Sequence, residues 1–145
     1  TFEHGPLAGF PVINVKSTLY DGSYHPVDSN EISFKLAASL AFKKAVETAG
    51  PTILEPILKL TITVNEQYVG DVMGDMNKRR GRVFGMLQSH EGHIVEAEAP
   101  ESEVLSYAID LKAMTQGSGS FQREFLRYEE VPAHLIPGII EKYKA

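Results

Sequence analysis

Residues 55–64, EPILKLTITV, decide the fold of this chain. After Glu55-Pro56, apolar side chains occupy every second position from Leu58 to Val64, with Lys or Thr between them. A strand with one buried face has this period of two, because successive side chains point to opposite faces of a sheet. We therefore predict a strand here, with its apolar face against a core.

Downstream of this strand, the sequence predicts two helices, three more strands and a helical tail. The first helix begins at Gly70-Asp71, ends at Gly81 and directs inward Val72, Met73 and Met76. The predicted strands are Arg82–Gln88, Ile94–Ala99 and Ser120–Tyr128, with a hairpin turn at Ser89–Gly92. Pro100 and Ser102 introduce a second helix that directs inward Val104, Leu105, Ala108 and Leu111, and the tail spans about Ile136–Lys144.

The order β-α-β-β-α-β over residues 55–130 indicates an α+β fold. It is the order of the ferredoxin-like sandwich, an antiparallel sheet with both helices on one face. Because this fold hosts many unrelated activities, it does not by itself predict a function.

Upstream, the sequence predicts a strand, a loop and a long helix. Residues 12–20 alternate between apolar and polar, which indicates a half-buried strand, and the turn-rich residues 21–26 follow as an exposed loop. Asp28 or Ser29 then caps a helix that ends at Gly50-Pro51.

The predicted upstream strand and helix have more apolar surface than they can bury against each other. The predicted helix carries Ile32, Leu36 and Leu40 on one face. We interpret the part as a partial α+β domain, strand-loop-helix, and expect exposed apolar surface near residues 12–20 and 32–46. In a purified fragment, self-association would cover that surface. The first residue is Thr rather than Met, and we interpret this start as a cut inside a longer polypeptide.

Composition excludes several classes of protein. The chain has no cysteine, which excludes disulfides and thiolate metal sites and agrees with a reducing, cytoplasmic location. No apolar run approaches the roughly 18–20 residues of a membrane span, and no signal pattern opens the chain. The net charge of −5 disfavours diffuse affinity for nucleic acid, because phosphate neutralisation needs clustered Lys and Arg.

One local basic group is nevertheless present: Lys78, Arg79, Arg80 and Arg82. The last turn of a helix favours cations, since its carbonyl groups carry partial negative charge. The group therefore has two interpretations that the residues alone leave open, a helix-end stabiliser and a contact to RNA phosphates.

The loop Ser23, Tyr24 and His25 also has two interpretations. An aromatic ring beside an imidazole can stack on bases or hydrogen-bond phosphates and ribose hydroxyls. An ordinary solvated loop has the same composition.

Neither a catalytic nor a metal site is predicted. His90 and His93 lie at a hairpin turn, where their spacing does not bring two ligands together. The loop at residues 116–120 lacks the Lys of a P-loop and precedes a strand instead of a helix. Asp71 and Asp75 are explained by capping and solvation, and no nucleophile motif is present. We therefore expect no enzyme and no cofactor in this chain.

Several stretches together resemble the end of bacterial elongation factor G, in its order and spacing. They are residues 5–12 (GPLAGFPV), 19–29 (LYDGSYHPVDS), 34–37 (FKLA), 54–57 (LEPI), 70–75 (GDVMGD) with 79–81 (RRG), and 107–117 (YAIDLKAMTQG). Any one of them is a weak signal, whereas the ordered set spans nearly the whole chain.

The resemblance implies that residues 1–52 are the second half of domain IV and residues 53–145 are domain V. In the family, domain IV reaches into the decoding centre of the small ribosomal subunit. There Ser23, Tyr24 and His25 would contact the tRNA–mRNA pair in the A site. Domain V lies near the sarcin–ricin loop and the stalk base, so Lys78, Arg79, Arg80 and Arg82 would contact rRNA or a neighbouring domain.

Two positions depart from the family's usual pattern. Pro26 stands where an acidic residue is common after the tip histidine, and Ser118 replaces a usual Arg. Sister families, the ribosome-protection tetracycline resistance proteins and the back-translocating and stress GTPases, share the architecture but usually diverge from Gly-Ser-Tyr-His.

We expect a parent protein that promotes translocation of tRNA and mRNA, with GTP and Mg bound by a domain outside this chain. Its partners would be the ribosome, including stalk-base proteins, and the rest of its own chain, with no membrane. A paralogue for ribosome recycling is one alternative. A stand-alone ferredoxin-like module that binds a ligand or a regulatory partner is another.

Overall fold

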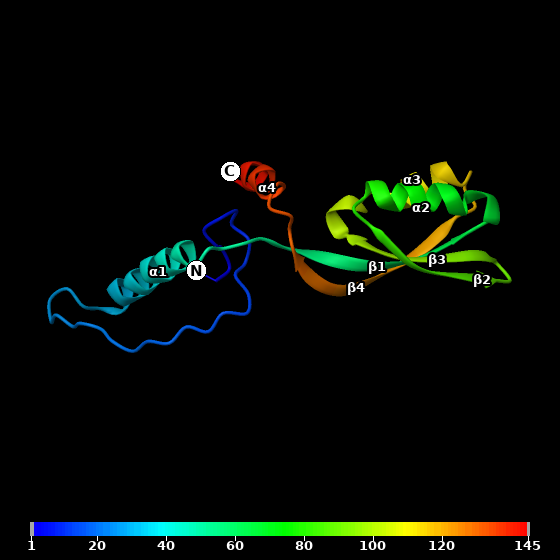
Figure 1. The fold of residues 1–145 in the computed structure, drawn as a ribbon. Helices are drawn as coiled ribbons and strands as arrows, with labels where there is room; N and C mark the ends of the chain where they lie inside the picture. The colour runs from blue at the N-terminus through cyan, green and yellow to red at the C-terminus, as the bar shows by residue number, and fades with distance from the viewer. Residues whose placement is uncertain (1, 145) are drawn as a thin grey trace. The chain divides into compact units, whose positions relative to one another are not determined.

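A computed structural model describes residues 2–144 and divides them into two compact units (Figure 1). Unit 1 holds the residues before Leu54 and those after Glu130, and unit 2 is Leu54–Glu130. The helices are α1 (Glu31–Thr48), α2 (Val69–Lys78), α3 (Tyr107–Met114) and α4 (Ile136–Tyr143), with short 3-10 helices η1 (Glu66–Tyr68) and η2 (Glu101–Glu103). The strands are β1 (Leu54–Val64), β2 (Arg82–Ser89), β3 (Gly92–Pro100) and β4 (Ser120–Glu130).

Unit 2 is a four-stranded sheet of order β2-β3-β1-β4 in which every neighbouring pair is antiparallel. Figure 1 shows α2 and α3 on the same side of this sheet. The predicted ferredoxin-like arrangement of an α+β fold is therefore confirmed. The hairpin turn between β2 and β3 also lies where the sequence predicts it, because Ser89 pairs with Gly92.

The core of unit 2 lies between the sheet and the two helices. Its fully buried side chains include Leu60 and Ile62 from β1 and Val72 and Met76 from α2. Glycine is required next to it at position 81, because a Cβ there would lie 2.9 Å from the carbonyl oxygen of Met76.

Three positions predicted to point inward are exposed. Met73 is 37% exposed, Leu105 is 74% exposed, and Ala108 is also exposed. Leu105 and Ala108 are exposed because η2 comes first and α3 begins only at Tyr107. The buried side chains here are therefore Val104, Tyr107 and Leu111. Tyr107, whose ring lies fully inside, is the core residue that the sequence analysis missed.

The strand predicted at residues 12–20 is absent, and the prediction is wrong. No residue of that segment has strand structure, and Leu19 is 92% exposed. A strand needs a hydrogen-bonding neighbour, and the described residues of unit 1 contain no other strand. The apolar face of α1 is likewise open, with Ile32 70% and Leu40 67% exposed.

The cap of α1 also differs from the prediction of Asp28 or Ser29. The N-cap is Asn30, whose Oδ1 accepts a hydrogen bond from the Ser33 N–H at 2.8 Å. Ser29 cannot take that role, because its Oγ accepts the N–H of His25.

A small apolar cluster in unit 1 joins residues from the beginning and the end of the chain. Ala8, Ile53 and Val131 are buried in it, and Ile139 and Ile140 of α4 pack against them. The compact units therefore differ from the expected domain limits 1–52 and 53–145, since the tail packs with unit 1. The limits of the domains themselves stay a prediction. Across residues 2–144, no helix combines the length and apolar character that a membrane span requires.

Ile139→Asp is expected to loosen unit 1 alone. Half-buried Ile139 packs on the small cluster, and removing it from an apolar contact costs about 1 to 3 kcal/mol. Hydrogen exchange should accelerate in α4 and in the turn at residues 5–12, while amides of the sheet keep their protection. Ile109→Asp is the matched control, because Ile109 is 74% exposed in unit 2. Equal exchange in both variants would contradict this packing.

Candidate functional site

The loop at residues 22–25 lies at the N-terminal end of α1 in unit 1. Tyr24 is 66% exposed, and Ser23 and His25 are exposed as well. The His25 N–H donates to Ser29 Oγ at 2.7 Å, and the Ser29 N–H donates to the His25 carbonyl at 2.9 Å. These two bonds close a turn around Pro26, so that the imidazole is presented to solvent from a hydrogen-bonded frame.

Tyr24 lies over a ring of the helix. Its centroid is 6.4 Å from that of Phe34 and the two planes are 15° apart, a stacked arrangement. One face of the Tyr24 ring is left open by its exposure. Such a ring can stack on a base, and the neighbouring imidazole can hydrogen-bond to a phosphate or a ribose hydroxyl.

The basic group in unit 2 splits into outward and inward members. Lys78 is exposed and has no ion pair among the described residues. The side chain of Arg82 is 75% exposed and lies 3.3 Å from Glu98, which also pairs with Arg127 at 3.0 Å. The hydrogen bonds from Arg127 are the largest cause of a lowered Glu98 pKa. Burial acts in the opposite direction and raises it by less.

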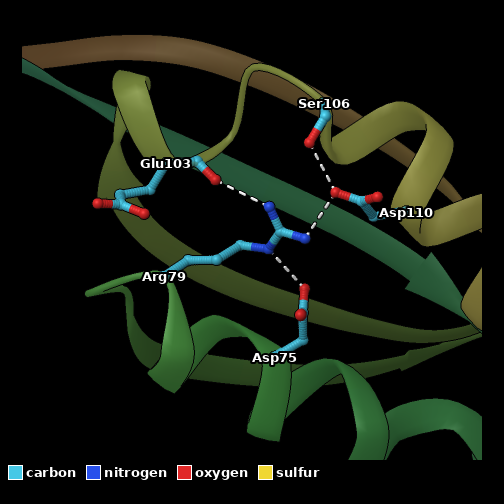
Figure 2. Close-up of polar contacts among 5 residues, drawn as sticks. All are labelled: Asp75, Arg79, Glu103, Ser106 and Asp110. Atoms are coloured by element: carbon cyan, nitrogen blue, oxygen red, sulfur yellow. Dashed lines mark hydrogen bonds and ion pairs between the residues drawn. The ribbon is translucent and has the colours of Figure 1, made fainter.

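Arg79 points inward and joins three elements (Figure 2). Its Nε donates to Asp75 at 2.7 Å, its Nη1 to the carbonyl of Glu103 at 2.8 Å, and its Nη2 to Asp110 at 2.8 Å. Ser106 donates a further hydrogen bond to Asp110 at 2.7 Å. The pKa of Asp110 is lowered, chiefly by this hydrogen bond from Ser106 and next by the hydrogen bond from Arg79. The guanidinium therefore links α2 to η2 and α3.

The same guanidinium lies over the Tyr107 ring, 5.1 Å from its centroid. Phe121 meets that ring edge-on at 5.0 Å. The Tyr107 hydroxyl is buried without a hydrogen-bond partner among the described residues, and burial raises its pKa. Arg79 is thus held by the core on one side and by carboxylates on the other.

Arg80 follows the C-cap of α2, Arg79, and has a left-handed conformation with φ of 56°. The Gly81 N–H donates to the Met76 carbonyl at 2.8 Å, which is a Schellman motif. Glycine usually takes the left-handed position of such a motif, because a side chain there costs about 1 to 2 kcal/mol. Arg80 instead donates from both Nη atoms to the Glu55 carboxylate, at 2.8 and 2.9 Å. This bidentate pair fixes the end of α2 to β1.

Carboxylates raise the pKa of both arginines. For Arg79, burial alone would lower the pKa, and the hydrogen bonds to Asp75 and Asp110 outweigh it. For Arg80, the hydrogen bond with Glu55 is the largest cause. Both guanidinium groups therefore stay charged at every physiological pH.

The partners of these arginines are the residues that sequence reasoning missed. The sequence predicts capping and solvation for Asp75, as for Asp71, whereas in the structure Asp75 pairs with Arg79 four residues later. That spacing is a signal readable from the sequence. No local signal links Arg79 to Asp110 or Arg80 to Glu55, because these pairs lie 31 and 25 residues apart. Among the described residues, no three His, Cys, Asp or Glu side chains could together hold a metal ion.

Two family models match consecutive parts of the chain. The model described as Elongation factor G, domain IV matches residues 1–50, and the model described as Elongation factor G C-terminus matches residues 52–138. The second alone covers more than half of the chain. The chain belongs to the elongation factor G family.

A solved structure resembles nearly the whole chain in sequence and in fold. A crystal structure of a protein from Thermus thermophilus is 46% identical and aligns over 99% of this chain with a TM-score of 0.83. The chain spans 22% of the length of that solved protein. The two family models confirm the predicted resemblance to elongation factor G, and the matched regions are those of a translation elongation factor.

Arg79→Met is expected to destabilise unit 2 far more than Lys78→Met. Removing the guanidinium, whose side chain is 16% exposed, leaves Asp75 and Asp110 without their cation and should cost about 2 to 3 kcal/mol. Lys78 is exposed and unpaired among the described residues, so its replacement should change stability by less than about 0.5 kcal/mol. Urea unfolding of the purified chain measures both. Similar losses in the two variants would contradict the inward role of Arg79.

Arg80→Gly is expected to be more stable than Arg80→Ala. Both variants lose the pair with Glu55, but only glycine relieves the left-handed backbone, which should make a difference of about 1 kcal/mol. The free energies of unfolding of the two variants give the comparison directly. An alanine variant at least as stable as the glycine variant would show that the backbone conformation carries no cost.

Proposed function

We propose that this chain is the ribosome-contacting C-terminal region of an elongation factor G that promotes GTP-dependent movement of tRNA and mRNA. The observation that carries the proposal is the match of residues 1–50 to domain IV, with an exposed aromatic and imidazole at a constrained turn inside it. Accessible rings of this kind can stack on unpaired bases of RNA. The proposed place of action is the cytoplasm.

Within this proposal the chain supplies contacts and geometry, while catalysis belongs elsewhere. GTP and Mg would be bound by a domain outside this chain. Ser23, Tyr24 and His25 would meet the tRNA–mRNA pair in the A site. The loop is exposed on its outer side, which leaves the imidazole free to approach a nucleic acid.

In unit 2 we assign any contact to rRNA or to a neighbouring domain chiefly to Lys78 and Arg82. Both are exposed, whereas the donors of Arg79 and Arg80 serve carboxylates of the same unit. Arg79 and Arg80 would then act by shaping the surface from which the other two project. Stalk-base proteins and the remainder of the parent chain are the other proposed partners.

His25→Ala in the intact parent protein tests the proposal. Loss of one contact to the tRNA–mRNA pair should slow tRNA–mRNA movement about tenfold, which corresponds to about 1.4 kcal/mol of barrier. GTP turnover should stay unchanged, since it depends on another domain. Fluorescence of labelled mRNA and release of phosphate measure the two steps separately.

His90→Ala is the matched control, because His90 is exposed at the turn between β2 and β3 of unit 2. It should leave both rates unchanged. If the His25→Ala variant promotes tRNA–mRNA movement at the rate of the unaltered protein, the assignment of His25 to this step is wrong.

A further inference from the structure

The loop that carries Tyr24 and His25 is fastened to the start of α1 at two separate points. The first is the pair of hydrogen bonds between His25 and Ser29, 2.7 Å from the His25 N–H to Ser29 Oγ and 2.9 Å in the reverse direction between backbone groups. The Asp28 N–H adds a longer bond to the His25 carbonyl, 3.2 Å. The Ser29 side chain is therefore the one that holds the backbone N–H of His25.

The second point is the ring of Phe34. It stacks with Tyr24 at 6.4 Å between centroids and 15° between planes. Phe34 lies in the first turn of α1, where its N–H donates to the carbonyl of Asn30 at 3.1 Å. Stacked aromatic rings attract each other beyond the burial of their surface, and here the stack ties an exposed ring to a regular helix.

The helix start to which both points belong is itself well fixed. Asn30 caps it through bonds from the Ser33 N–H at 2.8 Å and the Ser33 hydroxyl at 3.0 Å. On the other side of the loop, residues 12–25 have no helix or strand. The hydrogen bonds of His25 and the ring contact of Tyr24 go to Asp28, Ser29 and Phe34, so the order of these two residues rests on the start of α1.

We propose that Ser29 and Phe34 are positioning residues that set the direction of the His25 imidazole and the Tyr24 ring for contact with the tRNA–mRNA pair. This inference rests on the proposed function for its consequence, but its structural part stands alone. Neither residue would touch the nucleic acid itself. Ser29 acts through the backbone of His25, and Phe34 acts through the ring of Tyr24.

Backbone relaxation of the purified 145-residue chain tests the structural part. In Ser29→Ala and Phe34→Ala, the order parameters of Tyr24 and His25 should fall below about 0.6, the range of flexible backbone. Ser29→Thr keeps the hydroxyl and should restore the order. Circular dichroism should show the helix content unchanged, because Ser29 precedes the N-cap Asn30 and the Phe34 side chain is exposed on α1.

Tyr20→Ala is the matched control for Phe34→Ala. Tyr20 is an aromatic residue 95% exposed just before the loop, and its loss should leave the order of Tyr24 and His25 as it is. Unchanged order parameters in Ser29→Ala and Phe34→Ala would overturn the positioning role.

The same substitutions in the intact parent protein test the consequence. Ser29→Ala should slow tRNA–mRNA movement at saturating factor about fivefold, the equivalent of one hydrogen bond, and Ser29→Thr should recover the rate. Combined with His25→Ala, it should add no further loss, because it acts through His25.

Two outcomes separate this inference from the proposed function. If His25→Ala slows movement but Ser29→Ala and Phe34→Ala do not, the positioning role is wrong and the proposed function stands. If His25→Ala itself has no effect, the proposed function of the loop fails, while the relaxation measurements still decide whether Ser29 and Phe34 hold it.

Discussion

The structure of unit 2 depends on β1, which hydrogen-bonds to β3 on one side and β4 on the other. A strand paired on both sides sets the register of its neighbours, and a slip of one residue would turn its apolar side chains out of the core. Leu60 and Ile62 have no exposed surface at all. The period-two pattern of β1 makes one face of the sheet apolar. Both α2 and α3 pack on that face, because their own apolar side chains are buried there.

Charge then decides how the two helices meet. Arg79 has donors for Asp75, Glu103 and Asp110 at once, and Arg80 reaches Glu55 from a backbone conformation that glycine would adopt more easily. A left-handed arginine is tolerated when the bonds of its side chain offset the steric cost. Two members of the basic group, Arg79 and Arg80, are thus paired with carboxylates inside unit 2. The other two, Lys78 and Arg82, are exposed.

The sequence predicted unit 2 well and unit 1 poorly, and the reason is physical. The pattern of β1 through β4 is read from local alternation, and its partners all lie within the chain. Residues 12–20 carry the same alternation, yet they form no strand because no described strand of unit 1 pairs with them. The site shows the same limit. Ser23, Tyr24 and His25 are visible as a motif, whereas the stack of Tyr24 on Phe34 and the exchange of bonds with Ser29 appear only in three dimensions.

The two units therefore achieve order in different ways. Unit 2 has a contiguous core between its sheet and helices, and the half-buried ion pairs of Arg79 and Arg80 add to the order that this core provides. Among its described residues, unit 1 has only a small cluster of buried apolar side chains, at Ala8, Ile53 and Val131, and its exposed loop lies outside that cluster. A loop without a core beneath it keeps a defined shape only through local bonds to a rigid element. In this chain that element is the capped start of α1, to which half-buried Ser29 binds the His25 backbone and exposed Phe34 binds the Tyr24 ring.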